Sequence, residues 1–124
     1  MKRIVFFLFC MLFSFSFSAP GKDRSFFFVQ LSDPRLGLCS EDGGFEREKQ
    51  QFKQFIDAIN RLKPAFVVIS GNLVNDRGNA AQLAGFRELC RRIDSKIPIY
   101  LLPGACDVGD EASPEAVQDF IGRY

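Results

Sequence analysis

Hydrophobic residues gather in three short runs, and each run is followed by a stretch with helical spacing. The runs cover residues 25–31, 65–69 and 97–102 and are rich in Phe, Val, Ile and Leu. Such residues favour β-strands, and the turn-forming residues that follow end each run. The run at 65–69 has no polar alternation, which is typical of a strand covered on both faces. The pattern predicts three strands.

The segments between and after these runs repeat their apolar residues with the period of a helix. One face of the first segment carries Phe45, Phe52, Phe55, Ile56, Ile59 and Leu62. Pro64 stops that helix, and residues 80–93 form a second one. A third helix opens with Ser113 as N-cap and Pro114 at its first position. Alternating strands and helices predict a parallel α/β sheet with right-handed crossovers.

The first 18 residues follow a different pattern. Lys2 and Arg3 precede an unbroken apolar run at residues 4–12, and small side chains follow at Ser16 and Ser18. This order predicts a signal peptide at residues 1–18, a mature chain of residues 19–124 and a secreted or extracytoplasmic location. The alternative is a membrane anchor at residues 4–18, although a span needs about 20 apolar residues.

Composition narrows the chemistry that is open to the chain. The net charge is +1, with no basic run beyond Arg91-Arg92, so no nucleic-acid partner is expected. The chain has no His, which removes the usual general base and the commonest metal ligand. Cys39, Cys90 and Cys106 follow the signal peptide, and an odd number leaves at least one thiol without an intramolecular partner. Their pairing stays open.

Three loops follow the predicted strands and form the candidate site. They cover residues 32–37, 71–78 and 103–110, and each contains Gly together with Asp or Asn. In parallel sheets, ligands bind at the loops that follow the carboxyl ends of the strands. The same residue types are also ordinary turn formers, which is the alternative interpretation for any one loop.

These loops resemble the first three motifs of the calcineurin-like metallophosphoesterases. Residues 29–37 (VQLSDPRLG) resemble a strand that ends in Asp-x-His, and residues 67–76 (VVISGNLVND) a strand that ends in Gly-Asp. Residues 98–107 (PIYLLPGACD) resemble a strand that ends in Gly-Asn-His-Asp or Gly-Asn-His-Glu. The Asp-Pro-x-x-Gly form of the first motif is similar to the branch called calcineurin-like phosphoesterase domain-containing proteins. The resemblance implies the β-α-β-α-β-α half of a metallophosphoesterase-type α/β sandwich, as a partial domain at residues 19–124.

The same resemblance implies phosphoric ester hydrolysis by a pair of divalent metal ions that activate a bridging water. Five positions of the chain match the family's ligand and acid positions, and of these only Asp33 keeps the family's residue type. Arg35 replaces a His, Asn72 replaces the bridging Asp, Ala105 replaces an Asn, and Cys106 replaces the His that assists the leaving group. Asp107 matches the last acid of the third motif, which is not a ligand. We therefore expect a catalytically degenerate or truncated member of the family.

Other uses of these residues stay open. Arg35 is a candidate phosphate clamp, which makes a non-catalytic phosphate or phosphoprotein-binding module the alternative function. The competing interpretation is that Arg35 pairs with Asp33 or Asp107. Asp33, Asn72 and Asp107 are also candidates for a weak single site for Mg²⁺ or Ca²⁺. Cys106 as a nucleophile lacks a His to activate it.

The resemblance also predicts an exposed sheet. Family domains contain two packed sheets, and this chain supplies about the first half of one such domain. Uncovered strands leave unpaired backbone groups and apolar surface in contact with water. We expect a partner or a second copy to cover them, or an inter-chain disulfide through Cys39 or Cys106. A truncated gene product is the alternative.

Overall fold

The computed structural model describes residues 25–39, 45–111 and 113–124. The predicted signal peptide and its membrane-anchor alternative lie outside the described residues. In order, the elements are β1 (Val29–Ser32), α2 (Glu46–Leu62), β2 (Val67–Ser70), α3 (Ala80–Cys90), β3 (Ile99–Leu101), α4 (Ala105–Val108) and α5 (Pro114–Arg123). None of the helices in these ranges combines the length and apolar character needed to cross a membrane. The predicted α/β class is confirmed.

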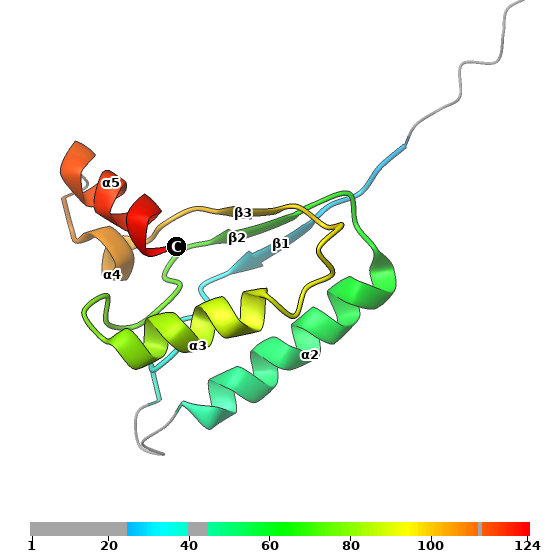
Figure 1. Cartoon of the computed structure of the whole chain (residues 1–124), viewed down its shortest axis with the longest axis horizontal. Coiled ribbons are helices and arrows are strands. Elements are labelled where there is room, and N and C mark those ends of the chain that lie inside the picture. Colours follow the sequence, from blue (N-terminus) through cyan, green and yellow to red (C-terminus); the bar gives the residue numbers. More distant parts are fainter. Residues whose placement is uncertain (1–24, 40–44, 112) are drawn as a thin grey trace, which may run out of the picture.

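The three strands form one parallel sheet in the order β1-β2-β3. Val67 of β2 lies opposite Val29 of β1 and Ile99 of β3. Helices α2 and α3 run along the same face of this sheet, and α4 and α5 lie beyond the carboxyl ends of the strands (Figure 1). All three loops that follow the strands therefore meet at one end of the molecule.

The core lies between the sheet and the two long helices. Phe52, Ile56 and Ile59 of α2 are each at most 3% exposed, at the spacing of one helical face. The prediction that Phe55 and Leu62 share this face is wrong, because they are 52% and 58% exposed. They flank the stripe that the sheet and α3 cover, so α2 buries a narrower face than the sequence pattern indicates.

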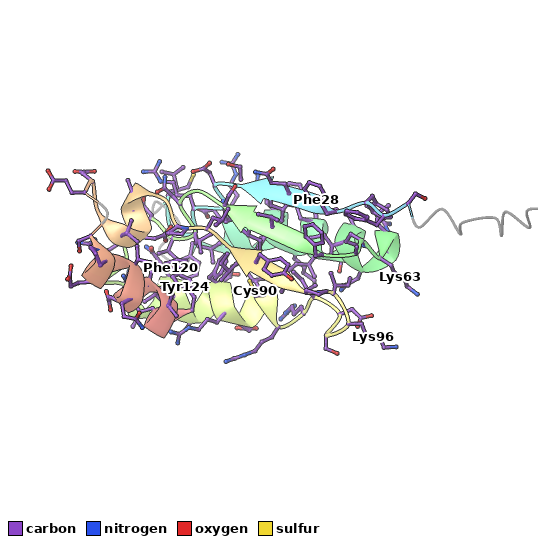
Figure 2. All side chains as sticks on the ribbon, turned by 90° about the horizontal axis from the view of Figure 1, so that it is seen from above. Phe28, Lys63, Cys90, Lys96, Phe120 and Tyr124 are labelled. Atoms are coloured by element: carbon purple, nitrogen blue, oxygen red, sulfur yellow. The ribbon has the colours of Figure 1, made fainter. Side chains whose placement is uncertain are left out.

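The opposite face of the sheet carries aromatic side chains and no helix of the described residues. Phe66, just before β2, stacks on Phe28 at 4.9 Å between ring centroids and meets Tyr100 of β3 edge-on at 5.7 Å. Phe28 and Tyr100 are half exposed or more, and Figure 2 shows Phe28 beside the strands. The expectation that β2 is covered on both faces is therefore wrong for the part of the chain that the structure describes.

Element boundaries differ from the expectations at several ends. The first strand begins at Val29 rather than at residue 25, and α3 ends at Cys90 although Ile93 still packs into the core. The loop expected at residues 103–110 contains the short helix α4, which the hydrophobic pattern did not predict. The start of α5 agrees with the prediction, since the Ser113 hydroxyl accepts the Ala116 N–H at 3.1 Å.

Candidate functional site

The first two loops continue the parallel pairing of β1 with β2. The Asp33 N–H donates to the Ser70 carbonyl at 2.8 Å, and the Arg35 N–H donates to the Asn72 carbonyl at 2.9 Å. Farther along, Leu36 and Val74 form an isolated parallel bridge. These bonds fix Asp33, Arg35 and Asn72 relative to one another by backbone contacts.

The exposed carboxylate of Asp33 is held by its neighbours. Its Oδ1 accepts the backbone N–H of Asn72 at 3.1 Å and the Asn72 side-chain amide at 3.3 Å, while the Ser32 hydroxyl donates to Oδ2. These contacts, above all the Ser32 hydroxyl, together with the positive charge of Arg35, lower the pKa of Asp33 below its ordinary value. Asp33 is therefore a carboxylate whose acceptor sites are already partly used.

Asn72 connects the first loop to the third. Its Oδ1 accepts the Cys106 N–H at 2.8 Å, so the three predicted residues Asp33, Asn72 and Cys106 form one hydrogen-bonded row. Two glycines make this approach possible. A Cβ at Gly71 would lie 2.6 Å from the Asp33 carboxyl, and one at Gly104 would lie 2.5 Å from Asn72 Oδ1. Larger residues at either position would push the loops apart.

Arg35 has a different partner from the two that the sequence suggested. Its Nε donates to Asn75 Oδ1 at 3.2 Å, and it forms no ion pair with Asp33 or Asp107 among the described residues. Asp33 and Arg35 both have left-handed backbones, with φ of 51° and 39°. Such conformations are uncommon outside glycine and concentrate at functional sites. The half-buried side chain of Arg35 is thus held at Nε by Asn75, and the left-handed backbone of its loop sets the direction in which the side chain leaves the chain.

Asp107 is completely buried and serves the fold. Its carboxylate accepts the N–H groups of Leu73 at 3.0 Å, Val74 at 3.4 Å and Gly104 at 3.0 Å, and the Tyr124 hydroxyl at 3.2 Å. These donors use lone pairs that a cation at Asp107 would need, and the single metal site at Asp33, Asn72 and Asp107 stays a prediction.

The residues present do not fit the pair of divalent metal ions that the family resemblance implies. The described residues hold no cluster of three or more His, Cys, Asp or Glu side chains that could hold a metal ion. Asn72 offers an amide where the family has a bridging carboxylate, and its Oδ1 already accepts from Cys106. No hydrolytic step through a metal pair follows from this arrangement.

A cavity of about 250 Å³ lies beside Asp33, between the end of β1 and α2. Glu48 of α2 also lines it, and Glu48 Oε1 accepts the Cys39 N–H at 2.7 Å. The sequence pattern did not indicate Glu48, Asn75 or Ser32 as site residues. Glu48 lies four residues before Phe52, on the buried face of the helix, so helical periodicity was the signal that could have found it.

Comparison with known proteins gives relatives of one kind. No protein-family model and no solved structure matches the chain. "Serine/threonine-protein phosphatase CPPED1" of Danio rerio is 33% identical over 114 residues, which cover 80% of this chain and 37% of the relative. The Bos taurus protein of that name is 34% identical over 110 residues, with 77% and 35% covered. The Homo sapiens protein is 30% identical over 114 residues, with 80% and 36% covered.

The chain thus spans little more than a third of the length of the curated relatives that it matches. One group of proteins is indicated by these relatives, by the three motif-like loops and by the parallel sheet that presents the loops. The chain is related to the calcineurin-like phosphoesterases.

Proposed function

We propose that this chain has the phosphoesterase-type α/β scaffold without metal-dependent hydrolytic activity. The observation that carries the proposal is the hydrogen-bonded row at the three loops. Of the five ligand and acid positions matched by sequence, only Asp33 keeps its residue type, and its Oδ1 is taken up by Asn72. Hydrolysis through two metal ions requires ligands that hold both ions close to an attacking water. Asp33, Asn72 and Cys106 supply mutual hydrogen bonds in place of such ligands.

The direct test is a phosphatase assay on the purified chain with 4-nitrophenyl phosphate and with a phosphoserine peptide. We expect no hydrolysis above background with Mg²⁺, Mn²⁺ or Fe²⁺. An Asp33→Ala variant distinguishes a contaminating phosphatase from the chain's own activity. Metal-dependent turnover that disappears in this variant would contradict the proposal.

The second candidate function is phosphate binding without hydrolysis, centred on Arg35. The anchoring of Nε on Asn75 favours it, because this bond orients the guanidinium and leaves its terminal nitrogens without a partner among the described residues. A guanidinium binds a phosphate through two parallel hydrogen bonds without a metal. The relatives are named as serine/threonine-protein phosphatases, so a phosphoprotein or another phosphate ester is the ligand that we propose.

Calorimetry with a phosphoserine peptide tests this second function. We expect micromolar binding that weakens with salt, because the contact is charge-assisted and partly exposed. Arg35→Gln should weaken binding at least tenfold, whereas Arg61→Gln, an exposed arginine on α2, should leave it unchanged. Asp33→Asn should strengthen binding, since it removes a negative charge beside Arg35. Equal affinities for the wild type and Arg35→Gln would exclude Arg35 as the clamp, with no bearing on the hydrolysis assay.

A further inference from the structure

A second cavity, of about 550 Å³, lies between α3, β3 and α5. It shares no residue with the three loops of the candidate site, so ligand binding here is independent of the proposed function. Its volume falls in the range of pockets that hold small organic molecules, about 300–1,000 Å³.

Apolar side chains form part of the inner surface of this cavity. Phe86 of α3 and Ile99 and Leu101 of β3 line it, and the Tyr124 ring meets Phe86 edge-on at 5.4 Å between centroids. Cys90 also lines it, and burial raises the pKa of its thiol to about 12. Figure 2 shows Cys90 beside β3 and Tyr124 near the end of α5. A hydrocarbon chain would meet matching surface here.

The rim of the cavity is positively charged. Arg87 of α3 and Arg91, the residue that caps its C-terminal end, are four residues apart, and neither side chain has an ion pair or hydrogen bond among the described residues. A third arginine at the rim, Arg123, is already engaged by Asp119 at 2.8 Å. No acidic side chain lines the cavity. Two guanidinium groups are therefore available to an anion.

We propose that this cavity binds an amphipathic anion, with a carboxylate or phosphate headgroup between Arg87 and Arg91 and an unbranched apolar chain over Ile99 and Leu101. Apolar walls with a few convergent polar groups are the usual composition of a small-molecule site. The guanidinium fork matches the planar geometry of a carboxylate and also accepts a phosphate. A cationic amphiphile would meet like charge at the same rim, so the sign of the headgroup decides binding.

Calorimetric titration of the whole chain with decanoate and with decyl phosphate, both below their micelle concentrations, tests the proposal. We expect saturable binding of at least one of the two, and no binding of decyltrimethylammonium. The double variant Arg87→Gln/Arg91→Gln should weaken binding at least tenfold. The matched control is Arg92→Gln, because Arg92 lies outside the cavity and pairs with Glu88 at 3.1 Å. This control should change the affinity less than twofold.

A second variant tests the cavity without altering its charges. Gly122 of α5 lines the cavity, and a Cβ at this position would meet no atom within 4 Å. Gly122→Trp should therefore fill part of the cavity and abolish binding while the thermal unfolding midpoint stays at or above that of the wild type. The proposal is overturned if neither anion binds the wild type, if Gly122→Trp binds normally, or if Arg92→Gln loses as much affinity as the double variant.

Discussion

At the scale of single residues, Asp107 and Arg35 of the candidate site differ in burial and in the number of their hydrogen bonds. Asp107 has no exposed surface, and its carboxylate accepts hydrogen bonds from three backbone N–H groups and one hydroxyl. Within the part of the chain that the structure describes, the Arg35 side chain makes one hydrogen bond, to Asn75, and is half-buried. The first side chain stabilises the junction of the loops, and the second is the one that we propose as a phosphate ligand.

Removing the Asp107 carboxylate should be costly to stability. Each buried donor left without an acceptor costs about 1–3 kcal/mol, so Asp107→Ala should lower the free energy of unfolding by about 3 kcal/mol or more. Urea denaturation followed by circular dichroism measures this change. Asp57→Ala, at an exposed position on α2, is the control and should stay within about 0.5 kcal/mol of the wild type. Equal losses in the two variants would contradict the role given to Asp107.

The cysteines should differ in reactivity because only the thiolate is nucleophilic. Burial raises the pKa of Cys90 to about 12, whereas Cys39 is exposed. At pH 8, iodoacetamide should modify Cys39 in the native chain and should spare Cys90 until urea unfolds it. Peptide mass spectrometry locates the label. Rapid modification of Cys90 without denaturant would show that its surroundings are open to solvent.

At the scale of elements, the start of α3 determines where the second loop ends. Asn79 is its N-cap, and Asn79 Oδ1 accepts the N–H groups of Ala81 at 3.0 Å and Gln82 at 3.2 Å. Gln82 in turn accepts the Asp76 N–H at 2.8 Å. The capped first turn therefore supports the loop that carries Asn72 and Asn75.

Loss of this cap should destabilise the chain by a modest amount. Asn79→Ala should cost about 1 kcal/mol, because it leaves two N–H groups of the first turn without their side-chain acceptor. Asn79→Asp keeps an acceptor oxygen and should retain wild-type stability, which chemical denaturation of both variants would measure. An equal loss in Asn79→Asp would show that the cap bond is not the cause.

At the scale of the whole molecule, the sheet is asymmetric. Helices α2 and α3 cover one face, while Phe28, Tyr100 and Leu102 are 50–57% exposed on or beside the strands. Contiguous exposed apolar surface of this kind usually marks a place where another protein surface packs. We propose that a second copy of the chain covers this surface.

This proposal predicts concentration-dependent association of residues 19–124. In sedimentation velocity, Tyr100→Lys should shift the population toward monomer, because a charge placed in an apolar contact must lose its hydration. Phe55→Lys, at a similarly exposed position on α2, should not. Reductant should change the result only for the fraction linked through the exposed Cys39. A monomer at all concentrations would refute the association.

The sequence by itself determined the α/β class, the order of the three strands and the three longer helices, and the end of the sheet at which the three loops gather. These features follow from local physics. Runs of β-branched and aromatic residues form strands, Pro64 and Ser113 mark helix ends, and parallel strands bring their following loops to one edge. The resemblance of the three loops to phosphoesterase motifs was likewise present in the sequence and is confirmed by the relatives. The signal peptide and the location stay predictions.

Only the tertiary structure decided which partners the site residues have. The sequence could not distinguish the buried Asp107 from the exposed Asp33, because both follow a strand in a turn-rich loop. The contact of Arg35 with Asn75 joins residues 40 positions apart and depends on the left-handed backbone of the first loop. The cavity with Arg87 and Arg91 at its rim depends on how α5 packs against α3. Hydrogen bonds and cavities arise from the positions of distant segments, whereas hydrophobic periodicity reports only the local conformation of the chain.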